Sequence, residues 1–119
     1  MVHSFRRETY KTRTMKIIDR GYLNVKGRQP FIAWVEQVGE GLFIDEESES
    51  NVYLVEEDFF EVEPIVKANF KKIFLNELEC ISDDESLFPE IKLEVFLEWF
   101  NVDAGTMVFD CEKGGLKGE

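Results

Sequence analysis

The sequence predicts a mixed α/β (α+β) domain in which helices cover a small sheet of three or four strands. Leu, Ile, Val and Phe make up about a third of the 119 residues, which is enough apolar surface for one core. Short β-forming runs alternate with segments whose apolar residues recur at helical spacing. The expected order is strand, helix, strand, helix, helix, strand. The connections between strands are long enough for crossovers, so parallel neighbours are also allowed.

The first strand and the first helix are expected between residues 17 and 39. β-forming residues run from Ile17 to Val25 around Gly21, which predicts one strand that can contain a bulge at the glycine. Pro30 then stands where a first helical position tolerates proline, and apolar residues follow at helical spacing until Gly39. This pattern predicts a short amphipathic helix.

A charged loop and a second strand are expected next. Residues 45–50, Asp-Glu-Glu-Ser-Glu-Ser, are too charged to pack and predict a solvated loop, although residues 42–44 before them can form a brief strand. Residues 52–55 are a continuous apolar run that ends at three acidic residues, which is typical of a strand buried on both faces. We therefore expect this second strand to be central in the sheet.

The longest helix is expected from Val62 to Ile81. Apolar residues recur there every three or four positions, which places them on one face of a helix. The polar residues that separate them, expected on the solvent side, are Lys67, Lys71, Lys72, Glu77 and Glu79.

The remaining chain contains two further start signals and a last strand. Ser82 and Glu85 have the spacing of a capping box, which predicts a new turn or helix. Pro89 can open a further helix whose apolar stripe ends at Phe100. Residues 107–109, Met-Val-Phe, follow a glycine and predict the last strand.

The chain is expected to form one domain with two flexible ends. Residues 1–14 are polar and basic and predict an arm, residues 15–111 form the globular domain, and residues 112–119 predict a flexible, glycine-rich tail. No apolar run is long enough to cross a bilayer and no export signal follows the basic start, so we expect a cytoplasmic protein. Cys80 and Cys111 are then expected to be reduced and packed.

Charge is the main indication of function. The net charge is −11, and it is uneven: residues 1–28 carry a net +6, whereas residues 29–119 carry a net −17. An acidic body is repelled by nucleic-acid backbones and anionic membranes and attracts basic surfaces. We therefore expect a basic protein as partner, and no membrane. The basic arm would be the only segment suited to nucleic acid, and the field of the body opposes that binding.

No catalytic or cofactor-binding motif is present in the sequence. The glycine-rich phosphate cradles and the nucleophile elbow are missing, and the acidic clusters lack the spacing of a calcium loop. His3, the single histidine, lies in the arm, so a zinc site or a catalytic triad in the domain is not expected. Trp34 and Trp99 lie on helical stripes and are expected in the core. We therefore predict no cofactor, no metal and no catalytic residue.

Two function classes fit these observations. The first is a non-enzymatic module that binds a basic protein through carboxylates. Its expected contacts are Glu46, Glu47, Glu49, Glu56, Glu57 and Asp58. The second is a small enzyme or ligand-binding domain in which the last three of these residues, at the end of the second strand, line the mouth of a pocket. An acidic surface can also serve solubility without binding any partner, so composition alone does not distinguish these two roles.

Two stretches of the sequence resemble a known group of proteins. Residues 21–37, GYLNVKGRQPFIAWVEQ, combine a strand with a Lys-x-x-x-Pro-Phe helix start, and residues 86–110, SLFPEIKLEVFLEWFNVDAGTMVFD, combine a Ser-Leu-x-Pro turn, a Trp-Phe helix and a Met-Val-Phe-Asp strand. In this pattern the chain resembles a group of small, acidic bacterial proteins of unassigned function. The resemblance implies a bacterial, intracellular protein and brings no activity to any residue.

Overall fold

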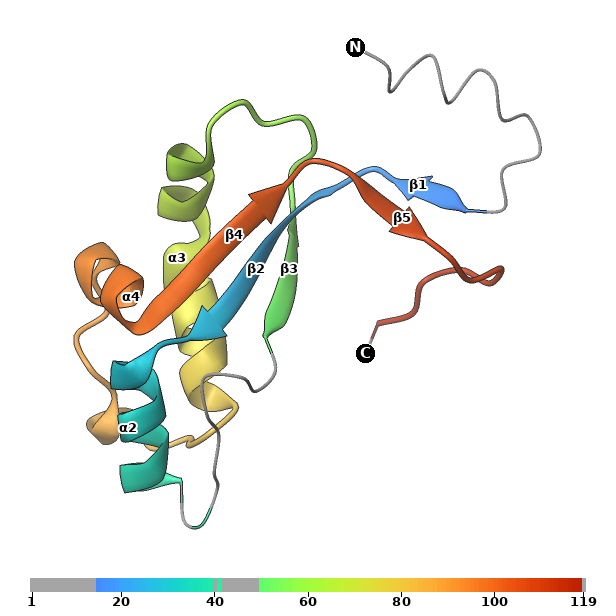
Figure 1. The fold of residues 1–119 in the computed structure, drawn as a ribbon. Helices are drawn as coiled ribbons and strands as arrows, with labels where there is room; N and C mark the ends of the chain where they lie inside the picture. The colour runs from blue at the N-terminus through green and yellow to red at the C-terminus, as the bar shows by residue number, and fades with distance from the viewer. Residues whose placement is uncertain (1–14, 40, 42–49, 119) are drawn as a thin grey trace.

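A three-stranded antiparallel sheet with helices on one face organises the molecule. The computed structural model describes residues 15–39, 41 and 50–118. The sheet has the order β3-β2-β4, with β2 (Gly21–Gly27) between β3 (Asn51–Val55) and β4 (Phe100–Gly105). In the view of Figure 1, the long helix α3 lies behind this sheet. The mixed α+β class expected from the sequence is therefore confirmed, and both strand pairs of this sheet are antiparallel rather than parallel.

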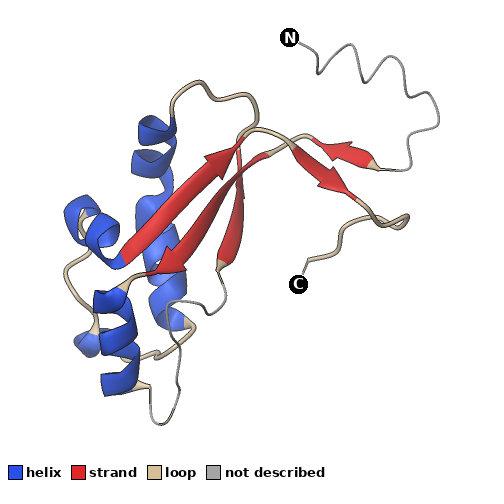
Figure 2. Ribbon diagram, in the orientation of Figure 1, coloured by secondary structure: helices blue, strands red, loops and turns tan. Residues whose placement is uncertain are grey.

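Three α-helices and one short 3-10 turn lie within the described residues. α2 (Gln29–Val38) has Pro30 in its first turn and ends at Gly39, and α3 (Val62–Glu79) spans 18 residues, both as expected. A 3-10 turn, Glu85–Leu87 (η1), and a short helix, Leu93–Trp99 (α4), follow. In Figure 2, α3 passes behind the three-stranded sheet, and α2 and α4 lie beside the end at which β2 finishes and β4 begins.

A two-stranded ribbon extends from one end of the sheet. It is formed by β1 (Lys16–Ile18) and β5 (Val108–Asp110), which pair antiparallel with Ile17 opposite Phe109. We call these two strands the β1–β5 ribbon (Figure 1). The expected single strand from Ile17 to Val25 is wrong, because the chain bends at Asp19-Arg20 and the two halves pair with different partners. The last strand was expected near residues 107–109 and is confirmed.

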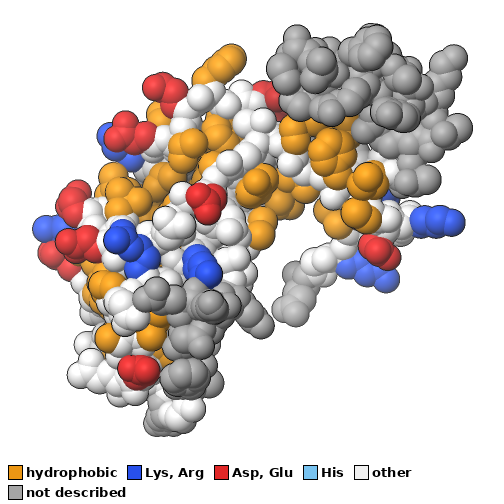
Figure 3. Space-filling view, viewed as in Figure 1, with side chains coloured by type: hydrophobic (Ala, Val, Ile, Leu, Met, Phe, Trp, Pro, Cys, Tyr) orange, Lys and Arg blue, Asp and Glu red, His pale blue; other side chains and the backbone are white. Residues whose placement is uncertain are grey.

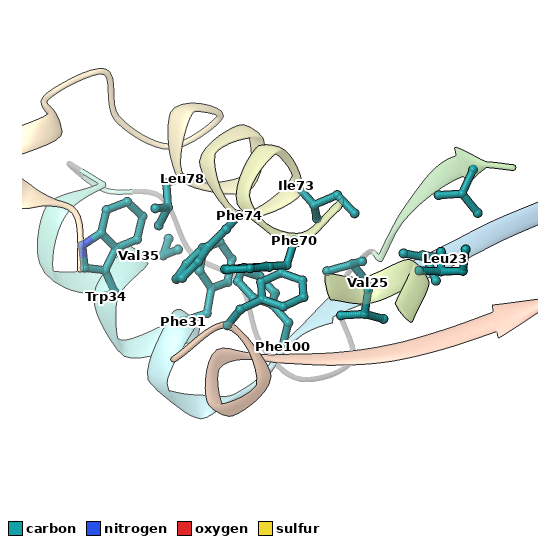
Figure 4. Packing of buried hydrophobic residues seen from close by; sticks show 14 residues of the cluster. Leu23, Val25, Phe31, Trp34, Val35, Phe70, Ile73, Phe74, Leu78 and Phe100 are labelled. Carbon is teal, nitrogen blue, oxygen red and sulfur yellow. The ribbon is translucent and has the colours of Figure 1, made fainter. Parts of the chain in front are cut away.

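The core lies between the sheet and the helices and is rich in aromatic rings (Figure 4). Phe74 of α3 is fully buried at its centre, with its ring centroid 5.5 Å from Phe96, 5.9 Å from Trp99 and 5.7 Å from Phe100. Trp34 is buried as expected, and its indole Nε1 donates a hydrogen bond to a backbone carbonyl, so burial leaves no unpaired donor. The other buried members of this cluster are Leu23, Val25, Phe31, Val35, Val55, Ile65, Val66, Phe70, Ile73 and Leu78.

β3 is an edge strand, so the expectation that it is central and buried on both faces is wrong. Among the described strands, β2 occupies the central position and β3 pairs with β2 alone. Val55 is buried, but Val52 and Leu54 are 61% and 48% exposed. The reason is that side chains alternate between the faces of a strand, and the described helices cover only one of them.

The chain between α3 and β4 also differs from expectation. The helix begins at Leu93 instead of Pro89, and Phe100 starts a strand, β4, that periodicity did not predict. The segment before α4 stays extended because Phe88 packs edge-on against Trp34, whose Nε1 bonds the Leu87 carbonyl at 2.9 Å. Phe100 leaves the helix because it pairs with β2, yet it still points into the core.

The turn after α3 is built differently from the expected capping box. The Ser82 hydroxyl accepts from the backbone N–H of Asp84 at 3.2 Å. Asp84, rather than Ser82, caps η1, because its Oδ1 accepts from the backbone N–H of Ser86 at 3.0 Å. A new turn therefore starts where the sequence predicted one, with a different capping residue.

Candidate protein-binding site

The predicted contact residues divide between one described loop and a segment outside the described residues. Glu56, Glu57 and Asp58 lie together in the connection from β3 to α3, and all three are exposed. Glu46, Glu47 and Glu49 lie outside the described residues. The structure thus places half of the predicted carboxylates at one site.

This connection, residues 56–61, is the acidic loop of the protein. Its six residues are four carboxylates and two phenylalanines, Glu-Glu-Asp-Phe-Phe-Glu. Asp58 has φ 56°, in the left-handed region that Asp adopts more readily than most residues, and so turns the chain sharply. Phe59 is half-buried and packs over Gly21, where an added Cβ would lie 2.8 Å from the Phe59 Cε2 atom. The loop is therefore held against the end of the sheet by one of its two rings.

The second ring of the acidic loop points into solvent. Phe60 is 102% exposed, whereas most aromatic side chains of the domain are buried or half-buried. Glu57, Asp58 and Glu61 flank it and are exposed as well. The sequence analysis did not single out Phe60. This residue lies two positions before Val62, where α3 and its apolar stripe begin, so it has no position on the buried face of the helix. The acidic loop combines negative charge with a free apolar anchor.

The hollow that the described residues form beside Val55 is not lined by the carboxylates of the acidic loop. A hollow of about 250 Å³ lies beside Val55, between β3 and α3. Its lining residues are Tyr53, Leu54, Val55, Asn69, Lys72 and Ile73, and none of them carries a carboxylate. The ligand-binding alternative, which places Glu56, Glu57 and Asp58 at a pocket mouth, gains no support from this hollow.

A second hollow, of about 480 Å³, lies beyond the C-terminal end of α3 and carries three carboxylates. Glu79, Asp83 and Asp84 are among its lining residues. The Asp84 carboxylate is already engaged, because its Oδ1 accepts from both the backbone N–H and the hydroxyl of Ser86. Local turn structure therefore accounts for the position of Asp84 without a ligand.

A buried polar network holds β3 against α3. Glu77 is only 6% exposed, so its expected place on the solvent side of the helix is wrong. Its Oε2 accepts from the Tyr53 hydroxyl at 2.5 Å and from Asn51 Nδ2 at 2.7 Å, and Asn76 Nδ2 donates to the Tyr53 oxygen at 2.9 Å. Position 77 lies four residues after Ile73 and three after Phe74, which are both buried. Helical periodicity therefore places Glu77 on the buried face of α3.

The network is a clamp rather than a reactive centre. Burial, and next the hydrogen bond to Glu77, raise the pKa of Tyr53 well above its ordinary value, so the phenol stays neutral and donates. Because β3 runs directly into the acidic loop, the Tyr53–Glu77 bond also fixes where that loop begins. The clamp thus positions the candidate site without being part of it.

Neither the two cysteines nor any cluster of metal-ligating side chains among the described residues adds a reactive group. Cys80 and Cys111 are unpaired, as expected, but both are exposed, so the expectation that they are packed is wrong. The Cys111 Sγ lies 3.6 Å from the Met15 Sδ at the β1–β5 ribbon. Among the described side chains, no group of three or more His, Cys, Asp or Glu residues is arranged to hold a metal ion.

No family model, no curated protein and no solved structure matches this chain. No helix in the described part of the chain combines the length and hydropathy that a membrane span requires. The resemblance to small acidic bacterial proteins stays a prediction.

Proposed function

We propose that the protein is a non-enzymatic binding module of the cytosol whose partner is a basic protein surface, contacted through the acidic loop. The observation that carries this proposal is Phe60, fully exposed in a loop with four carboxylates. Carboxylates alone serve solubility, but a free aromatic ring exposed among them has no such role. Aromatic residues are enriched where proteins meet, because they bury a large area with few rotatable bonds.

The two components of the acidic loop supply different parts of binding. The net charge of −11 steers a basic partner toward the surface and raises the association rate, an effect that salt screens. Burying the Phe60 ring contributes roughly 1.5–3 kcal/mol, which is about a tenfold to hundredfold gain in affinity. The ring therefore governs how long the complex lasts, and the charge governs how often it forms.

The acidic loop is ordered before a partner arrives, which lowers the entropy cost of binding. Phe59 packs over Gly21, Asp58 sets the turn, and the Tyr53–Glu77 bond fixes the strand before it. A preorganised loop loses less freedom in a complex than a flexible tail of the same composition.

The test is an affinity capture from source-cell lysate with the tagged full chain and two loop variants. One variant is Phe60→Ala, and the other replaces Glu56, Glu57 and Asp58 by Gln, Gln and Asn. A charge-matched control replaces three exposed carboxylates around α4 by Gln, namely Glu90, Glu94 and Glu98. All proteins are compared at low and high salt, followed by mass spectrometry and a titration with the purified partner.

The expected result is one basic protein that is retained at low salt and released at high salt. Phe60→Ala should weaken its binding about tenfold or more, and the triple loop variant should slow its association, while the α4 control behaves like the wild type. Equal binding by wild type and Phe60→Ala, or binding that salt does not affect, would contradict the proposal.

A further inference from the structure

No described element covers the face of the sheet opposite the helices, and this face is a second surface distinct from the acidic loop. Leu23 and Val25 of β2 point into the core, so the alternate residues of each strand point the other way. The register places Tyr22 beside Leu54 and Asn24 between Val52 and Asp103. We call this surface the open face; it consists of Tyr22, Asn24, Lys26, Val52, Leu54, Asn101 and Asp103. None of the described helices packs on it (Figures 1 and 2).

The open face is apolar at one end and electrically neutral as a whole. Val52 and Leu54 are 61% and 48% exposed, and Tyr22 lies next to them. Its charged side chains are Lys26 and Asp103, whose charges cancel, whereas the net charge of the whole chain is −11. A neutral face on an acidic protein is unsuited to a basic partner, which would gain nothing from meeting it.

The β1–β5 ribbon extends this surface beyond the sheet. Ile17 and Phe109 stand opposite each other on the ribbon and are 42% and 43% exposed, and Met15 is exposed beside them. In Figure 3, hydrophobic side chains lie over the sheet and again on the ribbon, with a notch between the two parts. Two three-residue strands form a marginal unit on their own, so a surface that covers their apolar side chains would stabilise them.

We infer that a second copy of this chain covers the open face, in a two-fold symmetric dimer that packs sheet against sheet. A two-fold axis that passes between Lys26 and Asp103 brings each lysine to the aspartate of the other copy, so one neutral face complements itself. Two sheets in this arrangement pack about 10 Å apart through their apolar side chains, here Val52 and Leu54 with Tyr22.

The ribbon is needed because the sheet alone is too small. Three strands of five to seven residues present a footprint of only about 14 by 17 to 24 Å, whereas stable interfaces bury about 800 Å² on each partner. Ile17, Phe109 and Met15 enlarge the apolar surface on the same molecule. The dimer is therefore expected to use the ribbon and the open face together.

Sedimentation velocity of the full chain between about 5 and about 200 micromolar tests the inference, because small interfaces associate weakly. The wild type should shift from monomer to dimer as concentration rises. Leu54→Glu should remain monomeric, whereas Leu97→Glu, which alters a leucine of similar exposure on α4, should dimerise like the wild type. Circular dichroism shows whether each variant is folded. A wild type that is monomeric at 200 micromolar overturns the inference, as does a dimer that Leu54→Glu leaves intact.

Charge reversal tests the arrangement of the two copies. Lys26→Glu and Asp103→Lys each turn two attractive contacts of the symmetric dimer into repulsive ones, and each should weaken association about three- to tenfold. The double variant exchanges the charges and should dimerise nearly as well as the wild type. Failure of the double variant to recover association, while both single variants weaken it, would overturn the two-fold arrangement.

Discussion

Replacing Phe74 by alanine should be among the most destabilising single changes in the domain. The side chain is fully buried, and three rings from α4 and β4 surround it at centroid distances below 6 Å. Removing a buried Phe costs the transfer free energy of the ring and leaves a cavity, together about 3–5 kcal/mol. A domain of this length has a free energy of unfolding of roughly 6–18 kcal/mol, so the variant keeps only part of its stability.

Urea unfolding followed by tryptophan fluorescence measures this loss directly. Trp99 lies 5.9 Å from the Phe74 ring and 6.1 Å from Trp34, so both indoles report on the same cluster. With a urea slope of about 2 kcal/mol per molar, a loss of about 4 kcal/mol lowers the midpoint by about 2 M. The thermal midpoint should fall by more than about 10 °C.

Phe60→Ala is the matched control, because it removes the same ring from a fully exposed position. It should change the free energy of unfolding by less than about 0.5 kcal/mol. If Phe74→Ala cost no more than Phe60→Ala at an unchanged urea slope, the packing described for the core would be refuted.

Two further changes test the sheet and the clamp. Gly21→Ala should destabilise the domain by about 1–3 kcal/mol in urea unfolding, because the new Cβ would lie 2.9 Å from the Glu56 carbonyl oxygen and 3.0 Å from that of Gly105. Gly114→Ala, with nothing within 4 Å, should have no effect, and equal behaviour of the two variants would contradict the close approach. The raised pKa of Tyr53 means that the folded state holds this proton more tightly than the unfolded state. The contribution of Tyr53 to the free energy of unfolding is therefore fully present below the ordinary tyrosine pKa, near pH 10, and it declines as pH rises above that value. Tyr53→Phe should lose part of this alkaline decline in unfolding measured from pH 8 to 11, and an unchanged pH profile would count against the clamp.

The candidate site was predicted in part. Glu56, Glu57 and Asp58 form one exposed loop, as their adjacency in the chain required. Phe60 was not identified, because a single apolar residue in a loop can point inward or outward, and here Phe59 takes the inward position over Gly21. The burial of Glu77 was not predicted, because a carboxylate is expected at the surface unless hydrogen-bond donors meet it. Its donors, Asn51 and Tyr53, belong to β3 and reach it only in the folded chain.

Local sequence determines the features of this protein that depend on near neighbours. α2 and α3 appear where apolar residues recur at helical spacing, and the acidic character of the body follows from composition alone. The type of an element with a long, regular period is set by its own residues, because each turn repeats the same contacts.

Features that depend on distant partners required the folded chain. The run before Asn101 reads as helix to its end, yet Phe100 pairs with Gly27, seventy-odd residues away, and becomes a strand. The apolar run of β3 reads as central, yet helices cover only one face, so Val52 and Leu54 stay exposed. A short apolar run fits a helix, an edge strand or a central strand equally well, and only the elements that pack against it select among them.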